Sequence, residues 1–156
     1  MKKERFKLIP AVWIFLKKDN KVLFLFRQNT GWEDGKFGLP AGHVDGNETI
    51  IQAAIRETQE ESSVKVNKDD LRVIHVLHKR NANGAESIDF FLETTKWEGI
   101  PRVNEPEKCG KAEWFDLNDL PKNIVGCVGH VIEQINKKVF YSEYGWEGEW
   151  QQKKIN

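Results

Sequence analysis

Three glutamates at helical spacing are the residues whose types and positions most strongly suggest chemistry. In the stretch IRETQEESS (55–63), Glu57, Glu60 and Glu61 stand at i, i+3 and i+4, so a helix would place them on one face. Like charges at these spacings cost roughly 0.2–0.5 kcal/mol per pair. The plain interpretation is a solvated acidic helix face, which most charge clusters are. The chemical interpretation is a site for a hard divalent cation such as Mg²⁺, which takes carboxylate and phosphate oxygens.

A glycine-rich loop precedes the acidic segment. The sequence RQNTGWEDGKFGLPAGHVDGNE (27–48) has five glycines between Gly31 and Gly46. Long structureless loops are uncommon in compact domains unless they are functional. Glycines let the backbone approach a metal or a phosphate closely, and the N-terminus of a helix adds unpaired N–H groups. We therefore expect this loop to contribute to the same site, with Asn47 or Thr49 as the helix cap.

An apolar stripe predicts how the helix is anchored. It consists of Ile50, Ile51, Ala54, Ile55 and Thr58, which recur at helical spacing. The acidic face is offset from this stripe. The carboxylates are therefore expected to point into a cleft while the helix remains packed on the core.

The remaining segments predict a sheet with helices on it. Alternating or apolar runs indicate strands at 11–16, 22–26, 71–78, 87–94 and 112–117, and a second helix is predicted at about 125–140. Strands, a helix, further strands and a helix favour an α+β fold with a mixed sheet. We expect a single domain over 1–156, with an uncertain tail at about 141–156.

The region that begins at Gly42 resembles a known motif. GHVDGNETIIQAAIRETQEESSV is similar to the Nudix box, GX5EX7REUXEEXGU, in which U is a bulky aliphatic residue. Thr58 stands where U is expected, and Ser63 stands where the second glycine is expected. The matching positions are Gly42, Glu48, Arg56, Glu57, Glu60, Glu61 and Val64. The segments FGLPAG and EPEKCGKAEWFDLNDLP extend the likeness over roughly 8–140, toward the subgroup that acts on nucleoside triphosphates, including damaged ones.

The resemblance implies a fold, a cofactor and a set of ligands. The fold would be a Nudix-type α/β/α sandwich with a mixed β-sheet between helices, and the cofactor Mg²⁺, with Mn²⁺ as a substitute. Glu48 and Arg56 would form a pair that orients the ligands and belongs to the catalytic set with Glu57 and Glu60. The implied metal ligands are Glu57, Glu60, Glu61 and a backbone carbonyl of Ala41 or Gly42.

The general base and the substrate contacts are open at this stage. Glu57 or Glu60 is the preferred base, with Glu105 or Glu107 as a candidate from outside the motif. The expected substrate-binding residues are Arg27, whose planar guanidinium suits phosphates, His43 and Glu105. For Trp32 and Phe37, packing is favoured over stacking on a base. Trp146 and Trp150 in the tail would cover the site or a partner, or simply pack.

The implied activity is a Mg²⁺-dependent pyrophosphohydrolase that converts a nucleoside triphosphate, including a noncanonical or oxidised one, to monophosphate and pyrophosphate. The alternative substrate is a nucleoside diphosphate linked to a sugar or another group. A remote alternative is a nucleotide-binding regulatory module without catalysis. Such modules usually lose motif carboxylates, and this chain retains all four motif glutamates.

Composition narrows the partners. Lys+Arg and Asp+Glu are equal at 24 each, so no global basic field indicates a nucleic-acid polymer. The apolar run at 8–16 is followed by a KKDNK turn and VLFLF, which favours a strand pair over a signal peptide or a membrane span. Cys109 and Cys127 are expected to be reduced thiols. We therefore expect a cytoplasmic protein with a small nucleotide as its partner, and a homodimer stays open.

Overall fold

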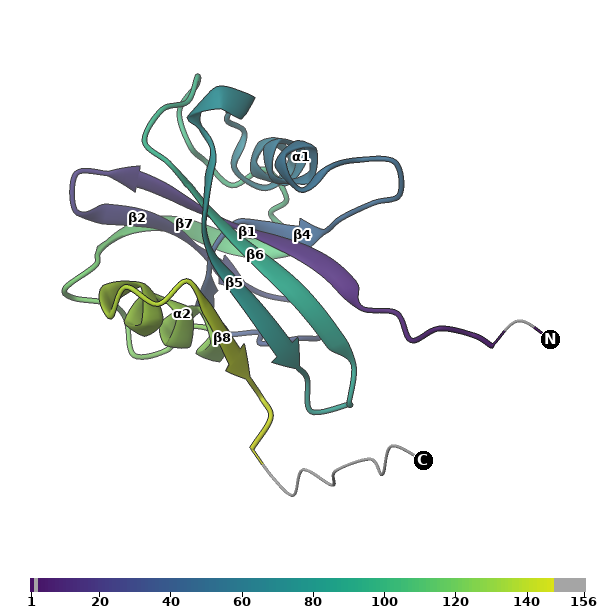
Figure 1. Cartoon of the computed structure of the whole chain (residues 1–156). Helices are drawn as coiled ribbons and strands as arrows, with labels where there is room; N and C mark the ends of the chain where they lie inside the picture. The colour runs from purple at the N-terminus through teal and green to yellow at the C-terminus, as the bar shows by residue number, and fades with distance from the viewer. Residues whose placement is uncertain (2, 148–156) are drawn as a thin grey trace.

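The computed structural model describes residue 1 and residues 3–147 of the 156-residue chain. Figure 1 shows strands crossing the middle of the molecule with one α-helix on each side. The elements, in chain order, are β1 (Ile9–Lys18), β2 (Lys21–Arg27), β3 (Phe37–Gly38), β4 (Ala41–His43), α1 (Ile50–Ser62), the 3₁₀-helix η1 (Lys68–Asp70), β5 (Arg72–Arg80), β6 (Glu86–Thr94), β7 (Cys109–Asp116), α2 (Gly126–Asn136) and β8 (Tyr141–Tyr144).

The sheet is mixed, as the sequence predicts. The strand order is β3-β2-β1-β6-β5-β8, with β4 also paired to β1 and β7 to β2. Strand β1 runs parallel to β6 along most of its length and antiparallel to β4 and β2. Because β1 holds both β4 and β6, it fixes the loop that precedes α1 against the centre of the sheet.

Alternation along β1 divides the core into two layers. Trp13 and Phe15 belong to the cluster under α2, whereas Val12, Ile14 and Leu16 belong to the cluster under α1. Successive side chains of a strand point to opposite faces, so one strand supplies both layers. Each fully buried large apolar side chain contributes roughly 1.5–3 kcal/mol. The α/β/α sandwich with a mixed sheet between helices is confirmed.

Helix α1 begins and ends as its residues dictate. Thr49 is the N-cap, and its side chain and that of Gln52 form a reciprocal capping box. Asn47, the other predicted cap, lies outside the helix with a positive φ of 66°. At the other end Ser63 adopts the left-handed conformation, with φ 62°, and its N–H donates to the carbonyl of Gln59. Ser63 thus closes the helix in the conformation that usually takes glycine.

The buried face of α1 differs in part from the predicted stripe. Ala54 and Thr58 are fully buried, whereas the three isoleucines of the stripe are only half-buried. Ala53 is buried as well, because small residues let the helix lie close to the sheet. The Thr58 hydroxyl donates to the Ala54 carbonyl at 2.7 Å, so a threonine satisfies its polar atom at a position where the motif has an aliphatic residue.

Three short strands were not predicted. Strands β3 and β4 lie within the glycine-rich loop, and β8 lies in the tail that the resemblance does not cover. Helix α2 ends at Asn136, four residues before the predicted end at Phe140, because Lys138 has a positive φ of 59° and the chain turns into β8. β8 then pairs in parallel with β5.

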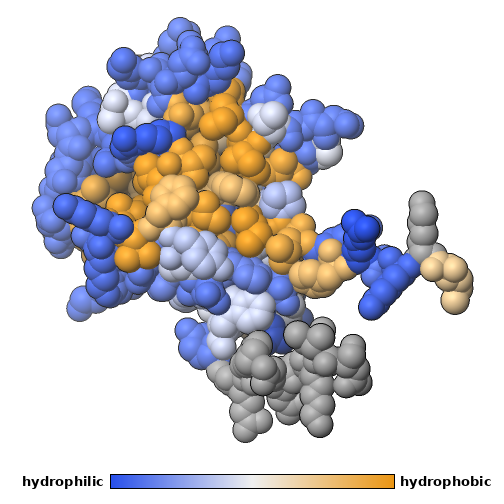
Figure 2. Space-filling view, in the orientation of Figure 1, coloured by the Kyte–Doolittle hydropathy of each residue, from blue (hydrophilic) through white to orange (hydrophobic). Residues whose placement is uncertain are grey.

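Figure 2 shows hydrophobic residues gathered over the centre of the sheet on the face seen in Figure 1, with hydrophilic residues around them. Within the described part of the chain, no helix is long and apolar enough to cross a bilayer. Cys109 and Cys127 are both free and buried.

Candidate active site

Arg56, in the middle of α1, is the centre of an ion-pair network. Its guanidinium binds Glu48 with both arms, from Nε to Oε2 at 3.0 Å and from Nη2 to Oε1 at 2.6 Å. Nη2 also donates to the carbonyl of His43 at 3.0 Å. The hydrogen bond from Arg56 is the largest cause that lowers the pKa of Glu48. Arg56 therefore ties the loop after β4 to the helix, in the arrangement that the resemblance implies for this pair.

Glu57 lies against the backbone of β4. Arg56 Nη1 donates to its Oε1 at 2.6 Å. Burial raises the pKa of Glu57, the bond from Arg56 opposes this shift, and the nearby charges of Glu60 and Glu105 add to it. A Cβ at Gly42 would lie within 2.5 Å of Glu57 Oε2 and closer still to Oε1. The glycine is therefore required for space at this contact.

Glu61 is the most deeply desolvated of the three acids. Its Oε2 accepts a hydrogen bond from the amide of Ala41 at 2.8 Å. The pKa of Glu61 is raised to about 8, chiefly by burial; the charges of Glu57 and Glu105 act in the same direction, while the Ala41 amide and the charge of Arg27 oppose the shift. The charge of Arg27 does not offset the burial of this carboxyl group, and a bound cation would supply further positive charge.

Glu60 faces away from the cavity that Glu61 lines. Its side chain is 49% exposed, and Oε2 lies 3.3 Å from Arg56 Nη1. It borders a separate depression with Gln52, Gln59 and Asn104. Across residues 1 and 3–147, no three His, Cys, Asp or Glu side chains are already grouped to share one cation. Arg56 thus holds Glu57 and Glu60 together, while Glu61 lies on the cavity side.

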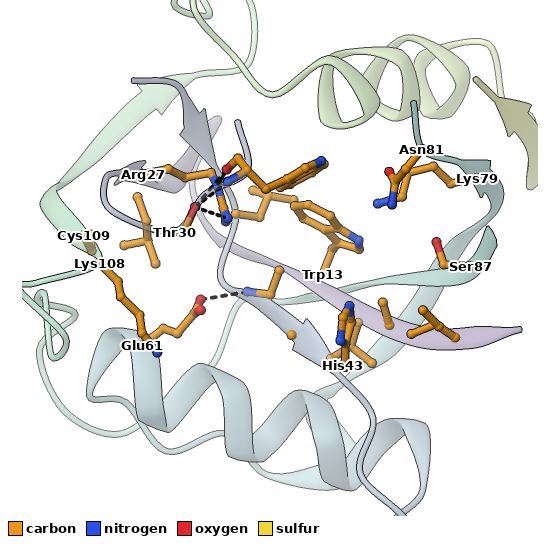
Figure 3. Close-up of a pocket in the computed structure, with 18 of the residues that line it drawn as sticks. Trp13, Arg27, Thr30, His43, Glu61, Lys79, Asn81, Ser87, Lys108 and Cys109 are labelled. Carbon is orange, nitrogen blue, oxygen red and sulfur yellow. Dashed lines mark hydrogen bonds between the residues drawn. The ribbon is translucent and has the colours of Figure 1, made fainter. Parts of the chain in front are cut away.

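A cavity of about 600 Å³ opens beside Glu61. Figure 3 shows Arg27, Thr30, Lys108 and Cys109 on the same side of it as Glu61, and Lys79, Asn81 and Ser87 on the other side, with Trp13 between them. The cavity is lined by residues of the strands β1, β2, β4, β5 and β6, of the loop after β2 and of α1, which contributes Glu61.

The three predicted substrate-binding residues, Arg27, His43 and Glu105, all line this cavity. Arg27 donates from Nε to the carbonyl of Trp32 at 3.0 Å and from Nη2 to Thr30 Oγ1 at 3.0 Å. It therefore also holds the loop between β2 and β3. Glu105 lies 3.4 Å from Lys108 in an ion pair.

The other residues that the sequence singled out lie in different places. Trp32 lines the cavity, whereas Phe37 is buried in the core under α2. Glu107 has an exposed side chain and does not border the cavity. Trp146 donates from its indole N–H to the carbonyl of His78 at 3.1 Å, so it packs on β5. Trp150 lies outside the described residues.

Sequence reasoning did not single out Lys79, Ser87 or Asp89. They lie on β5 and β6 at positions that face the core side of the sheet, and all three are buried. The signal was a polar residue at alternate positions in HVLHK and SIDFF; Lys79 lay one residue beyond the strand predicted at 71–78. Such residues are normally expected to face solvent, because buried polar groups are the exception.

Comparisons with known proteins agree with the motif. A NUDIX domain model matches residues 7–135. The ADP-ribose pyrophosphatase of Methanocaldococcus jannaschii is 35% identical over 125 residues, which are 78% of this chain and 71% of that protein. Putative nudix hydrolase 1 of Caenorhabditis elegans is 29% identical, and the match covers 71% of this chain but only 29% of that longer protein.

Among solved structures, the MutT NUDIX hydrolase from Burkholderia pseudomallei superposes with a TM-score of 0.76 at 27% sequence identity. That match covers 83% of this chain and 98% of the other. The family model, the relatives and the fold agree with one another. The chain therefore belongs to the Nudix hydrolase family and is an enzyme of the pyrophosphohydrolase class.

Proposed function

We propose that this chain is a Mg²⁺-dependent hydrolase that splits a nucleoside triphosphate into a monophosphate and pyrophosphate. The observation that carries the proposal is the placement of the acidic helix at one end of a cavity of about 600 Å³. Nucleotide-sized ligands occupy cavities of roughly 300–1,000 Å³. Glu61 of the acidic cluster, basic groups for phosphates and an aromatic wall line a single space.

The donor set fits a hard divalent cation. Glu57, Glu60 and Glu61 offer carboxylate oxygens, and burial is the largest cause that raises the pKa of Glu57 and Glu61. These three would hold the ion, together with a backbone carbonyl of Ala41 or Gly42. When bound, the cation would polarise phosphoryl oxygens and lower the pKa of a coordinated water.

The chain's own residues would do the positioning. Arg27 and Lys108 border the cavity on the side of Glu61 and bring positive charge to the phosphates. Glu57 or Glu60 would accept the proton of the attacking water, and Glu105 is the candidate from the opposite loop. Arg56 would keep the carboxylates in place through Glu48.

A second candidate is a nucleoside diphosphate joined to a sugar or another group. The relative from Methanocaldococcus jannaschii, at 35% identity, is named an ADP-ribose pyrophosphatase, and this likeness favours the second candidate. Both reactions break a diphosphate bond and use the same acidic residues. They differ in the second product, which is pyrophosphate for a triphosphate and the phosphorylated sugar or other group for the second candidate.

A substrate panel with Mg²⁺ separates the two. Nucleoside triphosphates, nucleotide sugars and ADP-ribose are incubated with the enzyme, and pyrophosphate is measured directly. Phosphate is then measured after a phosphatase has been added. Pyrophosphate from a triphosphate supports the leading proposal. A phosphomonoester from ADP-ribose, with no pyrophosphate from any triphosphate, supports the second.

Carboxylate variants test the metal assignment. Glu60→Gln and Glu61→Gln should each lower turnover by orders of magnitude, while the melting temperature stays similar or rises because repulsion is relieved. Glu107→Gln is the matched control, since that side chain is exposed and outside the cavity. If both motif variants kept full activity, the assignment of the ligands would be wrong.

A further inference from the structure

The end of the cavity opposite Glu61 carries polar groups that the acidic cluster does not use. Lys79 and Ser87 are directly opposed in the antiparallel pair of β5 and β6. Both line the cavity, although their residues are only 7% and 6% exposed. Trp13 lies on the same face of the sheet, because it pairs in register with Phe91, which is four residues after Ser87 on β6. The rings of Trp13 and Phe91 are stacked with their centroids 5.6 Å apart.

Ser87 has an unpaired hydroxyl. Its Oγ is buried and has no hydrogen-bond partner among the residues that the structure describes. Buried hydroxyl groups in folded proteins nearly always have a partner. A polar atom of a ligand in the cavity is the group that would pair with it, because Ser87 is part of the cavity wall.

Lys79 presents an ammonium group at the same end. Its Nζ lies 3.1 Å from Asp89 Oδ2 and near the rings of Trp13 and Trp32, at 5.4 and 4.9 Å from their centroids. The indole N–H of Trp13 donates to the same carboxylate oxygen at 2.9 Å. The pair of Lys79 and Asp89 is neutral overall, so this end suits an uncharged ring rather than a phosphate. An ammonium group has three donors and no acceptor.

We propose that Lys79 and Ser87 read a carbonyl oxygen on the base of the nucleotide, so that oxo-substituted bases are preferred over their amino-substituted counterparts. This inference rests on the proposed function, because it takes the phosphates to lie at the end with Glu61, Arg27 and Lys108. The indole rings of Trp13 and Trp32, which are tilted against each other with their centroids 6.2 Å apart, would form part of the wall beside the base.

The preference follows from hydrogen-bond chemistry. A ring carbonyl accepts from both the ammonium and the hydroxyl. An exocyclic amine could donate to the Ser87 oxygen, but it would place its donors against the Lys79 ammonium and would leave the Ser87 O–H without an acceptor. Asn81 offers a donor and an acceptor and does not discriminate. The carboxylate of Glu86 lies 3.4 Å from His78 Nε2 and is engaged there.

Matched nucleotide pairs test the inference through catalysis. ITP and ATP differ in an oxo or amino group on the purine, and UTP and CTP differ likewise on the pyrimidine. The wild-type enzyme should show kcat/KM at least tenfold higher for ITP than for ATP, and for UTP than for CTP. Equal values, or a preference for ATP and CTP, would overturn the inference.

Two variants assign the preference to these residues. Ser87→Ala removes a hydroxyl that has no partner among the described residues, so the fold should be retained. The ratio of kcat/KM for ITP to that for ATP should become smaller. The double variant Lys79→Met with Asp89→Asn removes both members of the buried charge pair, so neither charge is left uncompensated. This variant should have equal kcat/KM for ITP and ATP. Ser63→Ala is the control, because that hydroxyl is also buried without a partner among the described residues and does not line the cavity. If the ratio of kcat/KM for ITP to that for ATP were unchanged both in Ser87→Ala and in the double variant, the inference would also be overturned.

Binding without turnover separates this inference from the proposed function. IMP and AMP are titrated by calorimetry in the absence of added metal. Tighter binding of IMP, lost in Ser87→Ala, supports base reading even if no triphosphate is hydrolysed. If triphosphates are hydrolysed but IMP and AMP bind equally well, the inference about base recognition is wrong and the proposed function is retained. If no nucleotide is hydrolysed and neither monophosphate binds, both proposals fail.

Discussion

The carboxylate of Glu57 occupies the space that a side chain on Gly42 would need. A Cβ at Gly42 would lie within 2.5 Å of Glu57 Oε2. The backbone of Gly42 is not in the left-handed region, so the glycine is needed here for close approach between β4 and α1. The spacing of the motif thus places a small residue where the helix brings an acid against the strand.

Gly42→Ala should therefore displace Glu57 and lower kcat. A shift of about 1 Å in a group at the reacting centre costs roughly 100-fold in rate. The control is Gly46→Ala, since a Cβ there would meet nothing within 4 Å. Steady-state kinetics with saturating Mg²⁺ measure the effect. A Gly42→Ala enzyme as active as Gly46→Ala would contradict this account.

Arg56→Lys should weaken the use of Mg²⁺. Lysine keeps the charge but loses the planar fork that binds both oxygens of Glu48. Groups that orient metal ligands typically contribute about 10–100-fold in metal affinity or activity. The Mg²⁺ concentration for half-maximal rate is the measurement, and Arg72→Lys is the control, since Arg72 pairs with Glu93 on the exposed side of β5. An unchanged Mg²⁺ requirement would count against a positioning role.

Ser63→Gly should stabilise the fold. Ser63 closes α1 at φ 62°, and its hydroxyl is buried without a partner among the described residues. A non-glycine residue in the left-handed region costs roughly 1–2 kcal/mol. Ser63→Ala removes the same hydroxyl but keeps the Cβ. The difference between the two variants in the free energy of unfolding by urea isolates the backbone strain, and we expect about 1 kcal/mol in favour of glycine. Equal stabilities would show that the position is not strained.

Alkaline pH should destabilise the protein through Cys127. Burial raises the pKa of this thiol to about 12 from an ordinary value of 9.0. Between these values the unfolded chain loses the proton that the folded protein keeps, so the free energy of unfolding falls as pH rises from about 9 to 12. Urea denaturation from pH 8 to 10.5, compared with Cys127→Ala, measures this slope. The same slope in both proteins would exclude Cys127 as the cause.

Much of the fold follows from short-range patterns. Alternation and apolar runs located the main strands, and the residues from Thr49 to Ser63 predicted a helix and its first cap. The strands β3 and β4 were missed because each has no more than three residues, and their hydrogen bonds come from partners distant in sequence. The extent to which the isoleucines of α1 are buried depends on how closely the helix approaches the sheet. The small residues Ala53 and Ala54 allow that close approach.

The sequence by itself determined the acidic cluster, its arginine and the family resemblance, because these residues lie within 23 positions and one helix relates them. Only the tertiary structure decided that Glu61 borders the cavity while Glu60 faces another depression. The tertiary structure likewise brought Lys79 and Ser87 to the wall opposite Glu61. These residues come from strands whose neighbours are fixed by sheet register, and register depends on contacts between distant parts of the chain.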